Sequence, residues 1–264
     1  MKISVIVVTY NSDKYISKFL NTFFNFEPNF VYEIILIDNK STDRTVEIVK
    51  NYKKVKLIIR DKLYSFSNNN NFGAKFATGD ILAFLNPDIY FIDNSLKYVF
   101  DLFIKYPSVG IIGPKLLNDD QTVQYSARKF INISILISRL LYLGKDTTEN
   151  KVLKTYFQLS NYDENIFVDW VTGAALFVKK KIFMDDIGGF DEAYRLYIED
   201  EDLCLMALRR GWYTLYTNKI TLVHSHQRIS IKKLTKKTLY HFGGILIFLF
   251  KSYTGIYRLK KLKN

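Results

Sequence analysis

The 264-residue chain has a single cysteine, Cys204, which excludes an internal disulfide framework and a cysteine-rich zinc site. It also lacks the glycine-rich dinucleotide fingerprint, the phosphate-binding P-loop and the G-x-S-x-G turn of serine hydrolases. No apolar run reaches the ~20 residues of a membrane-spanning helix, and residues 1–8 have the pattern of a first strand rather than a secretory signal. We therefore expect a protein of the reducing cytosol.

Acidic residues are missing from the last part of the chain. All 26 Asp and Glu lie at or before Asp202, where 25 Lys and Arg nearly balance them, whereas 13 Lys and Arg follow from Leu203 onward. The formal net charge of +12 is therefore carried by the tail. This asymmetry predicts contact with membrane lipid, nucleic acid or a phosphorylated substrate, and a solvated tail that serves solubility is the alternative.

A hydrophobic content of 48% is enough for one large α/β domain with a sizeable core. Apolar runs typical of buried strands lie at residues 3–8, 33–37, 55–59 and 80–85. Segments with the apolar spacing of helices lie between them, at residues 15–24, 46–49 and 66–77. The alternation predicts a mostly parallel, doubly wound sheet with the loops after all four strands at one edge.

The second half of the chain continues this pattern less regularly. We expect a helix at 94–105, a strand at 109–112 that ends at Gly113-Pro114, strand character over 167–178 and a strand pair over 212–223. The residues from Glu199 open an amphipathic helix.

Two apolar segments are harder to interpret. Residues 129–155 predict an apolar helix that is either a core insertion, a dimer surface or a lipid-facing element. Residues 239–257 are interrupted by Lys251 and therefore suit a helix that lies on the domain or in the membrane interface. We place the only domain boundary near Gln227, where the basic tail begins.

One strand ends in a carboxylate that suggests chemistry. The segment Gly79–Asp88 is an apolar run followed by Asn86-Pro87-Asp88, which puts Asp88 at the carboxyl end of a buried strand. Ligands of open parallel sheets bind at this end, and a carboxylate there suits a divalent cation that carries a phosphate group. A solvated Asp after a proline turn is the alternative.

An ordered set of short motifs resembles family 2 glycosyltransferases, in particular their rhamnosyltransferase-like branch, over residues 3–230. The motifs are Val7–Ser12, Ile37–Asp43, Asn71–Ala74, Gly79-Asp80, Asn86–Asp88, Gly113–Leu116, Gly188–Glu192 and Glu199–Leu203. The resemblance implies the GT-A fold, inverting sugar transfer from a dTDP- or UDP-linked donor, and Mg²⁺ or Mn²⁺.

The resemblance also implies roles for residues on the donor side. The positions that match its donor-binding residues are Thr9, Tyr10, Asn11, Asp38, Asn71 and Asn86. Asp88 matches a metal ligand, with Asn86 in place of the usual first acid, and His224 matches a second metal ligand, with His226 as a nearby competitor. Asp38 is expected to accept a hydrogen bond from a pyrimidine N–H, or else to cap a turn.

On the acceptor side, Asp200 matches the general base that takes the proton of the attacking hydroxyl. Glu199, Trp170 and Gly173 match acceptor-binding positions. The alternatives are a solvated helix start for the acidic run and a core position for Trp170. Leu63–Phe66 departs from the Asn-x-Gly-Phe stretch of relatives, which leaves the donor's identity open.

Together these observations predict a GT-A domain over residues 1–227, with a nucleotide-sugar half at 1–115 and an acceptor half at 116–227, and a basic helical extension at 228–264. We expect an enzyme that transfers rhamnose or a hexose to a glycan or lipid-linked acceptor in bacterial surface polysaccharide synthesis. It would work in the cytoplasm, peripheral to the inner face of the membrane, and a homodimer is among its allowed states. The rivals are a non-catalytic protein that binds nucleic acid or membrane, and a nucleotidyltransferase on a related fold.

Overall fold

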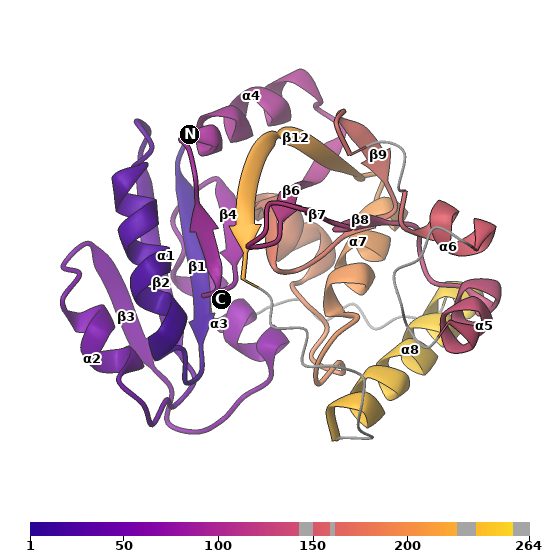
Figure 1. Cartoon of the computed structure of the whole chain (residues 1–264), viewed down its shortest axis with the longest axis horizontal. Coiled ribbons are helices and arrows are strands. Elements are labelled where there is room, and N and C mark those ends of the chain that lie inside the picture. Colours follow the sequence, from indigo (N-terminus) through magenta and orange to yellow (C-terminus); the bar gives the residue numbers. More distant parts are fainter. Residues whose placement is uncertain (143–149, 159–161, 226–235, 256–264) are drawn as a thin grey trace.

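A mostly parallel sheet forms the centre of the computed structural model, which describes residues 1–142, 150–158, 162–225 and 236–255. The strand order is β3-β2-β1-β4-β11-β6-β12-β5. Figure 1 shows this sheet between layers of helices, with the amino-terminal elements on one side and α5, α6 and α8 on the other. This arrangement confirms the predicted α/β, GT-A type of fold.

The first four long strands are parallel, as the sequence predicts. They are β1 (Ile3–Thr9), β2 (Tyr32–Asp38), β3 (Val55–Ile59) and β4 (Ile81–Leu85), with α1 (Asp13–Asn25), α2 (Thr45–Lys50) and α3 (Phe66–Phe76) between them. β1 is buried on both faces because its neighbours and helices cover it completely. The polar residues that follow β1, β2 and β4 therefore reach the same edge of the sheet.

The second half of the sheet is mixed. β11 (Ala175–Lys179) runs antiparallel between β4 and β6 (Val109–Leu117), and β12 (Tyr213–His224) runs parallel to β6 and antiparallel to β5 (Ile89–Phe91). The short strands are β7 (Val123–Gln124), β8 (Ala127–Arg128), β9 (Ile166–Val168) and β10 (Trp170–Val171). β12 brings His224 beside Ile89, next to the end of the Gly79–Asp88 segment.

Two strand predictions were wrong in this half. The strand from Val109 does not end at Gly113-Pro114 but continues to Leu117. Gly113 allows a close contact within the strand and does not mark its end, since a Cβ at this position would lie 2.4 Å from Val171 Cγ1. The expected strand pair at 212–223 is a single strand, β12, whose register is interrupted between Thr217 and Thr221.

Each face of the sheet has its own hydrophobic layer. α1 and α4 (Tyr98–Lys105), which follows the 3₁₀ turn η1 (Ser95–Lys97), pack on one face. On the other face lie α3, the π-helical turn η2 (Ile182–Ile187), α5 (Ile133–Leu141), α6 (Lys151–Tyr156), α7 (Glu199–Arg209) and α8 (Lys236–Thr254). α7, with its acidic first turn, lies within this second layer.

The apolar segment at 129–155 does not form one helix. It contains α5 and α6, and the residues between Tyr142 and Asn150 lie outside the described part. Asn132 and Asn150 cap the two helices by accepting hydrogen bonds from backbone N–H groups of their first turns. Ile135 and Leu153 are buried in the same layer as α7, which favours the core-insertion interpretation for this face of the segment.

α8 is docked on the domain. Ile245 and Phe248 are 6% and 0% exposed and belong to the layer that contains α7. Lys251 is also buried, and its Nζ lies 3.0 Å from Asp202 Oδ1 and 2.6 Å from Asp191 Oδ2. None of the described helices is long and apolar enough to span a bilayer. Gln227 and most of the basic residues of the tail lie outside the described residues.

Candidate active site

A cavity of about 390 Å³ opens beside the first turn of α7. Six residues that the sequence singles out line it: Asn86, Trp170, Gly173, Glu199, Asp200 and His224. The same cavity continues to Arg139 of α5 and His241 of α8. The structure thus brings the acceptor-side residues together with one predicted metal ligand.

Asp88 and His224 face each other at one end of this site. Asp88 Oδ1 lies 3.4 Å from His224 Nε2, and both side chains are largely buried. Gln124 determines the tautomer of the imidazole: its Nε2 donates to His224 O at 2.8 Å and to Asn118 Oδ1 at 2.9 Å, so its Oε1 is left to accept from His224 Nδ1 at 2.9 Å. Nε2 is therefore the ring nitrogen that faces Asp88.

This pair fits a divalent cation. Asp88 Oδ1 is buried and accepts no hydrogen bond from any residue that the structure describes, and it lies 3.4 Å from an imidazole nitrogen, so two common types of metal ligand face each other. Within the described ranges, no three His, Cys, Asp or Glu side chains gather closely enough to bind a metal by themselves. Two protein ligands leave coordination positions for oxygens of a bound diphosphate. His226 lies outside the described residues.

The predicted nucleoside residues lie at the ends of β1 and β2. Asp38 is fully buried, and its oxygens accept hydrogen bonds from Thr9 Oγ1 at 3.0 Å and from the Ser41 N–H at 2.9 Å. Asn11 has a left-handed backbone, with φ of 49°, and accepts from the Thr42 N–H at 2.8 Å. Tyr10 is 52% exposed. Asp38 thus holds the two loops together, and its contact with a base stays a prediction.

Asn71 links α3 to the turn that contains Phe190 and Glu192. Its Oδ1 accepts from the Phe190 N–H at 2.8 Å, and its Nδ2 donates to Phe190 O at 2.9 Å and to Glu192 Oε1 at 3.1 Å. Both polar atoms of this buried amide are therefore used inside the protein. The observed role of Asn71 is to position the turn, and a direct contact with the donor stays a prediction.

Asp200 is oriented by backbone donors. Its Oδ2 accepts from the Gly173 N–H at 2.7 Å and its Oδ1 from the Glu201 N–H at 2.9 Å. Burial raises the pKa of Asp200, while these two N–H groups and the charge of Arg128 oppose the rise. Gly173 is needed here, since a Cβ at this position would lie 3.2 Å from Asp200 Cβ. The carboxylate is thus fixed in one orientation at the cavity wall.

The neighbouring acids differ from Asp200 in their surroundings. Burial and the adjacent Asp200 raise the pKa of Glu199 to about 8, and burial raises the pKa of Glu201 well above its ordinary value. Glu201 accepts a hydrogen bond from the Ile131 N–H at 2.5 Å. Tyr197 and Ile198, just before α7, both have positive φ, 68° and 72°, a strained conformation for side chains of this size. The chain thus bends sharply to present the acidic turn to the cavity.

Trp170 both packs and lines the site. It is 5% exposed, and its Nε1 donates to Lys129 O at 2.8 Å. Trp170 therefore occupies a core position, which was the alternative, and it also borders the cavity. Sequence reasoning missed Gln124, Arg128 and Arg139, because nothing in their local sequence distinguishes them from surface polar residues.

Two solved structures share this architecture. GalNAc-T7 in complex with UDP, GalNAc and Mn²⁺ superimposes with a TM-score of 0.67 at 14% identity, covering 94% of this chain and 47% of that one. S. aureus TarS 1–349 in complex with UDP-GlcNAc gives 0.63 at 18% identity, over 95% of this chain and 67% of that one. These likenesses show that the chain has the GT-A fold.

The family follows from the sequence match. The family model described as glycosyl transferase family 2 matches residues 4–182, and the chain belongs to this family. It is 29% identical to the rhamnosyltransferase WbbL of Escherichia coli over 83% of this chain and 82% of that protein. It is 24% identical to the N-acetylglucosaminyl-diphospho-decaprenol L-rhamnosyltransferase of Mycobacterium tuberculosis over 96% of this chain and 86% of that protein.

Proposed function

We propose that the chain is an inverting, metal-dependent glycosyltransferase that moves rhamnose or a hexose from a dTDP- or UDP-linked donor to a glycan or lipid-linked acceptor. The observation that supports this most is the shared cavity of Asp200 and His224, with Asp88 3.4 Å from the imidazole. Inverting displacement needs a base on the acceptor side and charge neutralisation at the leaving diphosphate. Asp200 would supply the base, and the Asp88–His224 pair would hold the cation that neutralises the charge.

At the donor end, Asp88 and His224 would hold Mg²⁺ or Mn²⁺, which when bound neutralises charge on the leaving diphosphate. Gln124 would orient the imidazole for this role through its contact with Nδ1. Thr9, Tyr10, Asn11 and Asp38 would surround the nucleoside, and Asn86 would contact the donor from the cavity wall.

At the acceptor end, Asp200 would accept the proton of the attacking hydroxyl. The N–H groups of Gly173 and Glu201 keep its carboxylate aimed and stabilise its charged form. Trp170 would pack against the acceptor sugar, and Glu199 would contact its hydroxyl groups. With its pKa at about 8, Glu199 is mostly protonated at neutral pH and suits a hydrogen-bond donor better than a base.

The named activities of two relatives support the choice of acceptor and pathway. Both WbbL and the Mycobacterium tuberculosis relative are named as rhamnosyltransferases. The name of the second also gives its acceptor, N-acetylglucosaminyl-diphospho-decaprenol. We infer a role in bacterial surface polysaccharide synthesis at the inner face of the membrane. A homodimer stays a prediction.

A thermal-shift panel of UDP, dTDP and GDP, with and without Mn²⁺, tests the donor half of this proposal. At ~100 times Kd a ligand contributes about 2.7 kcal/mol, which corresponds to a shift of roughly 5–10 °C for a domain of this size. We expect one nucleotide to give such a shift, and only with the metal. Gln124→Leu should weaken Mn²⁺ binding by roughly 10- to 100-fold, and no shift with any nucleotide would contradict the proposal.

The exposed apolar side chains of α5 and α8, which we call the α5–α8 surface, would contact the membrane. They are Ile133, Ile137, Leu140, Leu141, Phe242, Leu246, Phe250 and Tyr253. The basic tail would add attraction to anionic lipid, which salt screens. Truncation at Gln227 cannot test this, because it would also remove the buried residues of α8.

Co-sedimentation with anionic vesicles is the suitable measurement of this contact. A Leu140→Ser, Phe250→Ser double variant should lower the bound fraction at least about tenfold, since each buried side chain contributes ~1.5–3 kcal/mol. Ile104→Ser is the matched control, because Ile104 is 65% exposed on α4, on the other face of the sheet. Equal binding by all three proteins would overturn the assignment.

A further inference from the structure

The active-site cavity is also lined by nitrogen-bearing side chains from three separate elements. Arg128 comes from β8, Arg139 from α5 and His241 from α8, and all three border the cavity that contains Asp200. His224 lines the same cavity. Proposed donor chemistry accounts for the carboxylates and His224, but it gives no reason for two arginines beyond the base.

The two guanidinium groups lie over one aromatic platform. Arg128 Cζ is 5.3 Å and Arg139 Cζ 5.5 Å from the ring centroid of Phe157, and Arg128 also lies 5.1 Å from Trp170. Cation–π contacts of this kind restrict the orientation of each guanidinium group, which carries five N–H donors. Arg128 Nε donates to Tyr125 O at 2.9 Å, and two guanidinium groups beside an apolar platform are suited to bind a phosphate oxygen by charge-assisted hydrogen bonds.

The local electrostatics also favour an anion. Burial and the charges of Arg139 and Arg128 lower the pKa of His241 to about 4, so the two arginines act together at the α8 side of the cavity. The acids that face Arg128 are Asp200 and Glu201, both on the first turn of α7. Glu201 also lines the cavity, and it accepts a hydrogen bond from the Ile131 N–H.

The same helices carry the α5–α8 surface. Arg139 is the only charged residue of α5, and its neighbours Leu140 and Leu141 are 62% and 75% exposed. His241 precedes Phe242, which is 48% exposed. Leu136 and Ile245 line the cavity between the two helices, so an apolar path connects the arginines with the exposed surface. Figure 1 shows α5 and α8 at this side of the molecule.

We propose that Arg128 and Arg139, with His241, form the binding site for the phosphate or diphosphate of an isoprenoid-linked acceptor, whose hydrocarbon chain leaves along the α5–α8 surface. The proposal rests on the proposed function, because it requires the acceptor sugar to reach Asp200. The sugar would lie against Trp170, the phosphate beyond it at the arginines, and the lipid between α5 and α8. The site thus selects acceptors by an anionic link as well as by the sugar.

Isothermal titration with farnesyl diphosphate tests the site directly, with EDTA present so that no metal carries the interaction. Farnesol and inorganic pyrophosphate are the companion probes, because each keeps one half of the ligand. We expect farnesyl diphosphate to bind at least tenfold more tightly than either. Equal binding of farnesol would reduce the site to an apolar surface, and equal binding of pyrophosphate would remove the lipid from the proposal.

Arg139→Gln should weaken farnesyl diphosphate binding by roughly 10- to 100-fold and leave farnesol unchanged. Arg128→Lys, which keeps the charge but loses the planar fork, should weaken it less. Arg210→Gln, at an exposed position after α7, is the matched control and should have no effect. An unchanged affinity in Arg139→Gln would overturn the proposal.

A competition experiment distinguishes this proposal from the function on which it rests. UDP with Mn²⁺ should not displace farnesyl diphosphate, because different side chains would hold the two diphosphates. Full displacement would assign the arginines to the donor and overturn the inference. Nucleotide binding without any farnesyl diphosphate binding would also refute the acceptor site but leave the donor site intact. Farnesyl diphosphate binding without any nucleotide binding would count against the proposed transferase function alone.

Discussion

Asp200→Asn should lower kcat by about 10²- to 10⁴-fold, the usual contribution of a positioned general base. The asparagine keeps the size of the side chain but presents one N–H₂ group where Asp200 accepts from Gly173 and Glu201. It can accept only one of these two hydrogen bonds, and it cannot take up the proton of the acceptor hydroxyl. Single-turnover transfer of a radiolabelled sugar measures the loss.

Donor binding supplies the control for this variant. The midpoint shift with the preferred nucleotide and Mn²⁺ should stay within error of the parent protein, because Asp88 and His224 are unchanged. Asp185→Asn, at an exposed position of η2, should transfer normally. Retained turnover in Asp200→Asn, together with loss of turnover in Glu199→Gln, would show that Glu199 and not Asp200 is the general base. Because burial raises the pKa of Asp200 above its ordinary value of 3.8, kcat/KM should already fall at a pH above 3.8 when the pH is lowered.

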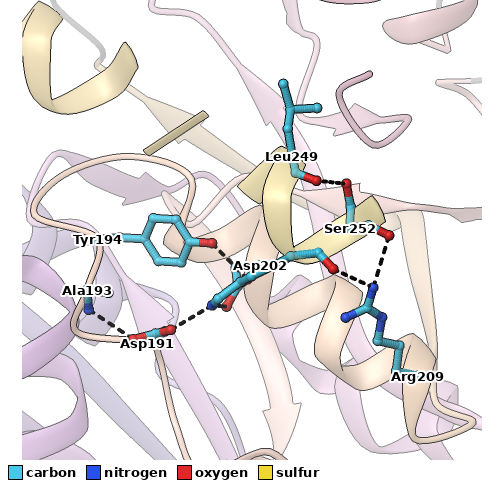
Figure 2. Close-up of polar contacts among 8 residues, drawn as sticks. Asp191, Ala193, Tyr194, Asp202, Arg209, Leu249 and Ser252 are labelled. Carbon is cyan, nitrogen blue, oxygen red and sulfur yellow. Dashed lines mark hydrogen bonds and ion pairs between the residues drawn. The ribbon is translucent and has the colours of Figure 1, made fainter. Parts of the chain in front are cut away.

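Lys251→Met should be the most destabilising single change in α8, by ~3–5 kcal/mol, because it leaves a buried carboxylate without its counter-ion. Asp202 is 3% exposed, and Lys251 Nζ contacts both of its oxygens, at 3.0 Å and 3.1 Å. Tyr194 donates to the same carboxylate at 2.9 Å, and Arg209 Nη2 donates to the Lys251 and Ser252 carbonyl oxygens (Figure 2). Urea unfolding measures the change in free energy.

The double variant Lys251→Met, Asp202→Leu should recover a large part of this loss, since it removes the unpaired charge as well. Lys50→Met, at an exposed position of α2, is the control for losing a lysine and should change stability by less than ~0.5 kcal/mol. If Lys251→Met unfolds at the same urea concentration as the control, the ion pair contributes nothing and α8 is held by its apolar residues alone.

The amino-terminal half of the fold was predictable because its strands are mostly apolar, with single polar residues such as Ser4 and Lys56. Val5 and Val7 are buried with Ile34 and Leu36 in parallel pairing, so burial on both faces leaves an unambiguous pattern. The second half was less predictable because its contacts are distant in sequence. β11 lies between β4 and β6, and no local signal in Ala175–Lys179 distinguishes an antiparallel neighbour from a parallel one.

The candidate site shows the same division. Residues in the family's motifs, such as Asp88 and Asp200, were named from the sequence alone. Lys251 was interpreted as a charge that interrupts an apolar helix, and only the structure pairs it with Asp202. Gln124 was not identified at all, since its contact with His224 spans 100 residues of sequence. Such positions become visible only when the sheet brings their strands together.

The docking of α8 has a consequence for the order in which the enzyme matures during synthesis. His241 and Ile245 complete the cavity, and Lys251 neutralises a carboxylate on the helix that carries Asp200. Residues 3–85 contain the first four long parallel strands and leave the ribosome long before these groups exist. A nascent chain therefore has the means to fold these strands first, and the cavity beside α7 is complete only when α8 has been made.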